Sequence, residues 1–367
     1  MAIPSSLTDE YGPLLTATAR NLQPRIADNI TKGNKYLAFM DAKGRLRFED
    51  GGERVQIALM HAQNTTADIV DGYDQIDTTP QGGFTSAFFD WRQIVVSVSI
   101  SRKEERQNSG KHKLLNLFQM KMDQAEASAK ELLNNCLVSG RITSGATGNL
   151  GQFDARVGKL NTSAKGPDPI PALIDSTPAR SVSIGNINGA TYSFWRNNAT
   201  DSAATTFAGY KQDLNGMYND CAKGVGGNPD LMLGDQVAWE QYFNSLQSQE
   251  RFATTEQSIF DVLQGAGAES LKFRGAHFIW DEVVPDVKTN ADVVDGIGTV
   301  TLSTVNFINS SAMEVIVDRE SNWDMSPMIQ PENQRARTGN MIWMGANTIN
   351  NRRKCGVLMG ISQSIVA

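Results

Sequence analysis

The sequence predicts an α+β protein, in which helices are separated along the chain from mostly antiparallel strands. Three stretches carry apolar residues at helical spacing, and the longest of them covers residues 111–139. Other stretches alternate apolar and polar residues, as half-buried strands do. At 367 residues the chain is too long for one compact core, which favours two lobes, or one irregular lobe with extensions.

The composition is that of a folded protein with long loops. Apolar residues make up 40% and charged residues 20%, which excludes a chain that is disordered throughout. A net charge of −6 argues against a general phosphate-neutralising surface, so any contact with DNA is expected to be local. Three distant cysteines and an N-terminus without a leader pattern indicate folding in a reducing cytoplasm. No run of 18 apolar residues occurs, so no membrane partner is expected.

The N-terminal part predicts an arm followed by a long hairpin. Residues 1–34 carry prolines among polar residues and indicate an extended arm. Residues 35–48 contain two apolar runs around an Asp-Ala-Lys-Gly turn, which predicts a short β-hairpin. Strands are expected at 55–59 and 93–100, and the polar loop between them ends in aromatic residues. Because so long a loop is usually functional, we expect a hairpin that buries its aromatics on a neighbour.

Residues 111–139 predict the long helix around which the chain is organised. No proline interrupts the stretch, Ser109 can cap its start, and Gly140 stands where a left-handed residue ends a helix. At 1.5 Å per residue the helix is a rod of about 40 Å. Its apolar stripe is expected to pack on the subunit's own sheet and comprises Phe118, Met122, Ala125, Ala129, Leu132 and Cys136.

A basic segment precedes this helix. Lys111 and Lys113 oppose the helix dipole, which costs about a few tenths of a kcal/mol. The segment is either a solvated basic turn or a patch that forms salt bridges with the acidic surface of another subunit. The residues concerned are Arg102, Lys103, Arg106, Lys111 and Lys113.

The C-terminal half alternates helices, strands and loops. Residues 140–190 are rich in Gly, Ser, Asn and Pro and predict connecting loops and short strands. An amphipathic helix is expected at 207–221, capped by Thr205 or Thr206, and a second one around 239–246. Strands are expected at 230–233, 271–280, 304–307, 314–317, 341–344 and 355–361.

Motifs for catalysis or cofactor binding are missing from the sequence. It contains no Walker loop, no Rossmann glycine fingerprint between a strand and a helix, and no nucleophile elbow. The three histidines lie in different segments, so no metal, cofactor or catalytic residue is predicted. An enzyme would have to use His277, Asp281 and Glu282, although His277 fits a half-buried strand better. Cys136 and Cys221 lie on apolar helical faces and are expected in the core.

The order of these parts resembles the major capsid protein of tailed bacteriophages, with the Hong Kong 97-type fold. Local stretches carry the resemblance as well, and each is loose on its own. They are Trp-Arg-Asn at 195–197, Pro-Asp-Leu-Met at 229–232, Leu-Lys-Phe-Arg-Gly at 271–275, Asp-Glu-Val-Val-Pro at 281–285, and residues 340–347 before 355–361.

The resemblance implies a division of the chain into five parts. These are an N-terminal arm (1–34), strands with the extended β-hairpin or E-loop (35–101), a peripheral domain with the spine helix (102–198), an axial domain (199–310) and return strands of both domains (311–367).

The implied function is a shell subunit without enzymatic activity. Pentamers and hexamers of the chain would form the icosahedral capsid of a tailed phage, assembled in the host cytoplasm, which encloses double-stranded DNA without sequence-specific binding. Separate scaffolding, portal and cement proteins are possible partners. An encapsulin-type nanocompartment shell is the alternative with the same fold, and a carbohydrate-binding module is a third class. Closed symmetry adds weak contacts into a stable particle.

The hairpin and the basic segment are the expected contacts between subunits. In the hairpin these are Arg54, Phe84, Phe88, Phe89, Trp91 and Arg92, beside the basic residues given above. Two departures from the family stand out. Residues 53–101 contain no lysine, so a hairpin donor for an isopeptide crosslink is missing. No removable scaffolding segment of the length that some members carry is expected before the arm.

Overall fold

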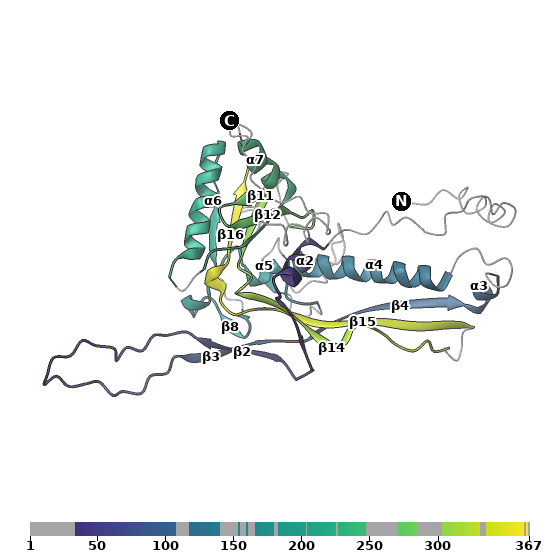
Figure 1. Cartoon of the computed structure of the whole chain (residues 1–367), viewed down its shortest axis with the longest axis horizontal. Coiled ribbons are helices and arrows are strands. Elements are labelled where there is room, and N and C mark those ends of the chain that lie inside the picture. The colour runs from purple at the N-terminus through teal and green to yellow at the C-terminus, as the bar shows by residue number, and fades with distance from the viewer. Residues whose placement is uncertain are drawn as a thin grey trace. The chain divides into compact units, whose positions relative to one another are not determined.

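The computed structural model describes residues 34–107, 117–139, 153–154, 159–160, 166–179, 183–202, 204–224, 227–246, 271–284, 303–330, 335–362 and 365. Helices and mostly antiparallel strands are both present, which confirms the α+β class (Figure 1). The described residues divide into two compact units, one from the described parts of 95–129 and 325–341, and the other from the remaining described residues. The division into five parts stays a prediction.

A six-stranded sheet forms one layer of the larger unit, with the order β11-β12-β10-β13-β16-β9. β10 pairs in parallel with β12 and antiparallel with β13, while β16 pairs in parallel with β9. The strands are β9 (Asn198–Asp201), β10 (Leu231–Gly234), β11 (Leu271–Phe273), β12 (Ala276–Trp280), β13 (Ser303–Ile308) and β16 (Gly356–Ile361).

Both faces of this sheet are covered. Residues of β10, β13 and β16 are buried without exception, as in sheets that carry a layer on each side. Alternate side chains enter two separate cores: Met232 packs with α6 and α7, whereas Leu231 and Leu233 face the other core. Figure 1 shows α6 (Phe207–Ala222) and α7 (Gln236–Leu246) beside the sheet.

The two helices follow their sequence patterns. The Thr206 hydroxyl accepts a hydrogen bond from Gly209 N at 3.3 Å and caps α6, as predicted. The buried face of α6 carries Tyr210, Leu214, Met217, Tyr218 and Cys221. A Cβ at Gly356 would lie 2.5 Å from Met217 Sδ, so only glycine lets β16 approach α6 this closely.

A second sheet has the order β1-β14-β15-β4, and β1 pairs in parallel with β14. Its strands are β1 (Leu46–Glu49), β4 (Arg92–Ser101), β14 (Met313–Met325) and β15 (Ala336–Ile349). The strands predicted at 314–317 and 341–344 are shorter than β14 and β15. In β14 the buried residues lie at the start of the strand, and those after Asp318 are exposed or half-buried. In β15 the first part alternates in burial, whereas residues 345–349 are all buried.

The predicted spine helix is present as α4 (Leu117–Val138), while residues 111–116 and the Phe118 side chain lie outside the described part. Ala125, Ala129 and Cys136 are buried as expected. Met122 and Leu132 are only half-buried, and Leu133 and Leu137 fill the core further along the helix. The predicted stripe repeats every seven residues, whereas two turns of an α-helix contain about 7.2 residues. The buried face therefore rotates along the helix, and the buried positions move from Leu132 to Leu133 and from Cys136 to Leu137 as well.

Three predictions of secondary structure and strand pairing are wrong. Residues 35–42 form helix α2 (Lys35–Ala42) instead of a hairpin strand, because Asn34 Oδ1 caps the helix by accepting from Leu37 N at 2.9 Å, and Tyr36, Phe39 and Met40 bury one face. The expected strand at 271–280 is a hairpin, since Arg274 (φ 55°) and Gly275 turn the chain between β11 and β12.

The third correction concerns the long hairpin. Its outgoing strand, β2 (Val55–Met60), pairs with β3 (Phe84–Phe89). The sequence indicated 93–100 as the return strand, but these residues belong to β4 in the other sheet. Apolar and polar residues alternate more regularly in β4 than in β3, so the sequence pattern pointed to β4 and not to β3 as the partner of β2.

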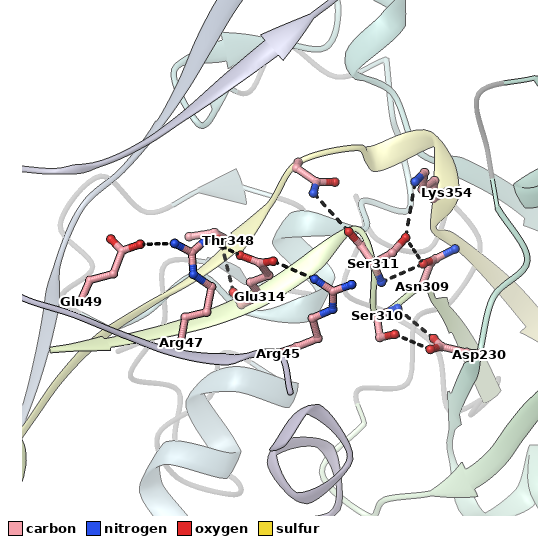
Figure 2. A network of polar contacts seen from close by, with 11 residues as sticks. Arg45, Arg47, Glu49, Asp230, Asn309, Ser310, Ser311, Glu314, Thr348 and Lys354 are labelled. Atoms are coloured by element: carbon pink, nitrogen blue, oxygen red, sulfur yellow. Dashed lines mark hydrogen bonds and ion pairs between the residues drawn. The ribbon is translucent and has the colours of Figure 1, made fainter. Parts of the chain in front are cut away.

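Polar contacts hold the turn between β13 and β14 (Figure 2). Asp230 accepts hydrogen bonds from the backbone N (2.8 Å) and the hydroxyl of Ser310. Glu314, at the start of β14, forms ion pairs with Arg45 (3.1 Å) and Arg47 (3.2 Å). The turn thereby joins the end of the six-stranded sheet to β1, so the two sheets are braced where the chain passes from one to the other.

Arg352 is the largest buried cation among the described residues, with 2% of its surface exposed. Its guanidinium donates to Leu173 O (2.8 Å), Trp195 O (3.0 Å) and Asn197 Oδ1 (3.0 Å). Burial lowers the pKa of Arg352 to about 10, which leaves it charged at neutral pH. The side chain therefore ties η4 (Arg352–Lys354) to α5 (Ile170–Leu173) and η2 (Ser193–Trp195).

We expect Arg352→Ala to lower the free energy of unfolding of the subunit by about 3–5 kcal/mol, because three buried acceptors lose their donor. The neighbouring exposed Arg353 is the matched control, and Arg353→Ala should change the free energy by less than about 0.5 kcal/mol. Denaturant titration of unassembled subunits measures both. Equal stabilities of the two variants would contradict the anchoring role.

Candidate subunit interface

The base of the β2–β3 hairpin is fixed in the chain's own core. Val55 stands opposite Phe89, and both side chains are buried. Phe88 N donates to Gly185 O at 3.1 Å, so the turn between β7 (Ser183–Ile184) and β8 (Ile187–Asn188) rests on β3. A Cβ at Gly185 would lie 3.0 Å from Ala87 Cβ, which requires glycine at this contact. The hairpin is therefore held firmly where it begins.

The outer loop of the hairpin, residues 61–83, projects beyond β2 and β3 (Figure 1). His61 N donates to Gly83 O at 2.8 Å, and Thr65 Oγ1 donates to Gln81 Oε1 at 2.9 Å across the loop. Ile69 is 98% exposed. The other large apolar side chains exposed on the loop or at its ends are Met60, Val70, Tyr73, Ile76 and Phe84. An apolar group of this kind marks a surface that another molecule covers.

Carboxylates alternate with these apolar residues. Residues 62–83 contain four aspartates, Asp68, Asp71, Asp74 and Asp77, and no lysine or arginine. Asp74 Oδ2 accepts from Asp71 N at 2.9 Å, and Asp77 accepts from Thr79, whose hydrogen bonds lower the pKa of Asp77. The loop thus presents an acidic and apolar surface, which suits an apolar partner surface with basic residues at its edge.

The four aromatic residues predicted as contacts between subunits have different positions. Phe84 is 81% exposed and remains available to a partner. Phe88 and Trp91 are half-buried, and Trp91 packs on the core of its own chain. Phe89 is 1% exposed within that core, so its assignment to an intersubunit surface is wrong. Strand alternation explains the difference, because Phe88 and Phe89 point to opposite faces of β3.

Two arginines at the hairpin base share one carboxylate. Arg54 Nε lies 3.1 Å from Asp90 Oδ1, and an Arg92 guanidinium nitrogen lies 3.5 Å from Asp90 Oδ2. The Arg54 and Asp90 side chains are about half-exposed. Pairs of this kind contribute little to stability, which leaves them available to rearrange when a partner binds.

The predicted basic segment lies partly on α3 (Arg102–Gln107), where Arg102, Lys103 and Arg106 are exposed. Lys111 and Lys113 lie outside the described residues. Arg102 N donates to Arg335 O at 3.0 Å, which places an exposed arginine from a distant segment beside α3. Lys121 Nζ binds Glu104 Oε2 (2.9 Å) and Ser99 O (3.2 Å). We call Arg102, Lys103, Arg106 and Arg335 the basic cluster.

Sequence reasoning missed Arg335 and the apolar residues of the outer loop. No local signal connects Arg335 to α3, because only strand pairing brings the two together. The apolar loop residues were visible in the sequence, since Ile69, Tyr73 and Ile76 stand among aspartates at no regular strand spacing. That combination in a long loop is itself a signal for a binding surface.

The residues of the alternative enzyme hypothesis do not form an open site. His277 and Asp281 are each 4% exposed, and Glu282 is exposed at the surface. Burial raises the pKa of Asp281, whose carboxylate accepts from Val283 N (3.0 Å) and lies 3.5 Å from Asn134 Nδ2. The contact with Asn134 joins the turn after β12 to α4, which is a structural role.

Among the described residues no group of three His, Cys, Asp or Glu side chains could hold a metal ion. Cys136, Cys221 and Cys355 are buried free thiols, and burial raises their pKa values to about 12. Such thiols are packing groups rather than nucleophiles. None of the described helices is long and apolar enough to cross a membrane.

Comparisons with known proteins show similarity in structure. No family model matches the chain, and no curated protein is similar in sequence. A chain of the cyanophage A-1(L) capsid asymmetric unit superposes with a TM-score of 0.63 and 12% identity, over 94% of this chain and 98% of that one. The capsid chain of Myoviridae phage XM1 gives a TM-score of 0.54 at 12% identity, covering 98% and 99%. The SrpI encapsulin of Synechococcus elongatus PCC 7942 gives 0.51 at 11% identity, covering 99% and 98%.

These similarities extend over nearly the whole chain and establish the fold as the Hong Kong 97 type. The fold expected from the order of the sequence elements is thereby confirmed. The identities of 11–12% are too low for the comparison to transfer more than the fold.

We expect the outer loop to be dispensable for the subunit and necessary for association. Residues 62–82 can be replaced by Asn-Gly, which closes a two-residue turn between His61 and Gly83. Because the loop's apolar side chains are exposed in the subunit, the free energy of unfolding should change by less than about 1 kcal/mol. Particle formation, measured by sedimentation, should be lost.

The matched control for this replacement is Phe89→Ala, which removes a buried ring of the hairpin base. It should destabilise the subunit itself by about 3–5 kcal/mol. A large loss of subunit stability on loop replacement would instead place the loop in the chain's own core.

Proposed function

We propose that this chain is the major capsid protein of a tailed double-stranded DNA bacteriophage and that its copies assemble into the icosahedral shell around the genome. The observation that supports this most directly is the match to the cyanophage capsid chain over 94% of this chain and 98% of that chain. Matching over nearly the full length of both chains means that the overall fold is shared, rather than one common motif.

The surface of the outer loop supports the same function. An isolated subunit would expose six large apolar side chains on or beside that loop, and burying each of them would contribute about 1.5–3 kcal/mol. Association with another copy can provide that burial. The loop's four aspartates and the other copy's basic cluster are opposite in charge, so the loop of one copy fits against α3 and Arg335 of the next.

The particle's partners follow from this role. Copies would form pentamers and hexamers, and separate scaffolding, portal and cement proteins would complete the particle in the host cytoplasm. A net charge of −6 would leave packaged DNA without sequence-specific or tight phosphate contacts. No catalytic role is part of the proposal, because His277 and Asp281 are buried as structural groups.

An encapsulin-type nanocompartment shell is the second candidate, supported by the similarity to SrpI with a TM-score of 0.51. The phage assignment is favoured by the higher TM-score of 0.63 with the cyanophage chain. The content of native particles separates the two functions. Nuclease-protected DNA inside the shell supports the capsid, whereas a protein cargo without DNA supports the nanocompartment.

We expect the purified chain, alone or with a scaffolding protein from the same genome, to form closed particles of roughly megadalton mass. Sedimentation and electron microscopy measure this. A chain that remains a 40.0 kDa monomer under all these conditions would rule out a shell function.

The charge pairing between loop and basic cluster is testable by isosteric replacement. Changing Asp68, Asp71, Asp74 and Asp77 together to Asn should raise the subunit concentration needed for assembly by about tenfold, since exposed pairs contribute about 0.2–1 kcal/mol each. The dependence of assembly on salt should weaken in the variant. Asp201→Asn, at an exposed aspartate outside the loop, is the control. An unchanged salt dependence of assembly in the variant with all four Asp→Asn substitutions would contradict the pairing.

A further inference from the structure

A cavity of about 200 Å³ lies at the base of the β2–β3 hairpin. Five segments line it: the two ends of the hairpin, the start of β4, the entrance of α5 and the turn between β7 and β8. Charged residues of this cavity are Arg54, Asp90, Arg92 and Asp168. The remaining wall is made by Phe88, Phe89, Ala172, Ser183, Ile184, Gly185 and Asn186.

Three of the four charges are accounted for. Asp90 binds both Arg54 (3.1 Å) and Arg92 (3.5 Å), as described above. Asp168 is different, because no hydrogen bond or ion pair from the described residues reaches its carboxylate. Only its backbone is held, by Asn347 Nδ2, which donates to Asp168 O at 3.0 Å. The cavity thus contains a carboxylate that forms no hydrogen bond or close ion pair with the described residues, although the charge of Arg92 attracts it.

This carboxylate destabilises the isolated subunit at neutral pH. Burial raises the pKa of Asp168 to about 6, with Asp90 adding to the increase and Arg92 opposing it. A folded-state pKa above the unfolded value means that stability falls as pH rises through the window between about 4 and 6, and stays lower above it. A neutral residue would fit better in the subunit, so the carboxylate points to a use outside it.

We propose that this cavity receives a lysine or arginine side chain from a second copy of the chain, with Asp168 as its ion-pair partner. The proposal rests on the assembly function proposed above and specifies one contact of that assembly. The cation would place its charge against Asp168 and its methylene groups along Phe88 and Ala172.

Three features favour a side chain of another copy as the occupant. Arg54, Asp90 and Asn186 are exposed and form an accessible rim, so a side chain can enter. Arg54 and Asp90 of this rim lie at the base of the hairpin that carries the proposed intersubunit surface, so a second copy bound there is close to the cavity. A bare divalent cation would need several oxygen ligands, whereas Asp90, the other carboxylate in the lining, is occupied by two arginines.

The test compares Asp168→Asn with the native chain in the free subunit and in assembly. The exposed Asp201→Asn is the matched control for loss of one negative charge. In unassembled subunits at pH 8, Asp168→Asn should leave the melting temperature unchanged or raise it by about a few degrees, because a half-buried charge with a raised pKa is removed. At pH 8, the subunit concentration needed for assembly should be about three- to tenfold higher for Asp168→Asn than for the native chain.

The pH dependence distinguishes this contact from a general loss of charge. Lowering the pH from 8 to 5 protonates Asp168, so the native threshold should approach that of Asp168→Asn, which should itself change little. Asp201→Asn should follow the native chain at both pH values. Double variants then identify the cation. Asp168→Asn is combined in turn with Arg102→Gln, Lys103→Gln or Arg335→Gln, and the residue that pairs with Asp168 is the one whose effect on the assembly threshold is not additive with that of Asp168→Asn.

Two outcomes would overturn this inference while leaving the shell function intact. In one, Asp168→Asn assembles at the native threshold. In the other, Asp168→Asn melts well below the native chain as a free subunit, which would place the partner cation within the same chain. If the native chain forms no particles under any condition, both the inference and the proposed function fail.

Discussion

The outer loop of the hairpin leaves its apolar side chains exposed to water, so folding of the single chain does not bury all of its large apolar residues. Ile69, Tyr73 and Ile76 gain nothing from the folding of their own chain, and the aspartates between them keep the surface soluble until a partner arrives. The base of the same hairpin is the opposite case, with Ala87 and Phe89 buried. One hairpin therefore combines an anchored half with a half that is stabilised only by association.

The rest of the larger unit supplies the rigidity that such an arrangement requires. A contact made by a projecting loop fixes the position of a neighbour only if the base of the loop does not move. Two cores, one on each face of the six-stranded sheet, and the buried guanidinium of Arg352 hold that frame together. The polar turn around Ser310 and Glu314 braces the passage between the two sheets without adding apolar area.

Local signals predicted the three longest described helices, α4, α6 and α7, whereas pairings between distant segments could not be predicted. Thr206 and the apolar face of α6 are encoded within one segment, so both followed from the sequence. Residues 35–42 were misassigned because the turn signal at 41–44 competed with the helical spacing of Tyr36, Phe39 and Met40. The cavity around Asp168 and the burial of Arg352 had no sequence signal, since each depends on several segments that only the tertiary fold brings together.

The position of β16 has a consequence for how the protein is made. Residues 356–361 lie between β13 and β9, so the strand translated last of the six occupies an inner place in the sheet. Until it is inserted, β9 has no partner in this sheet and the cores on both faces lack Val357, Leu358 and Met359. Long-range pairings of this kind form late in folding. The six-stranded sheet of a nascent chain thus stays incomplete until the strand β16 has emerged.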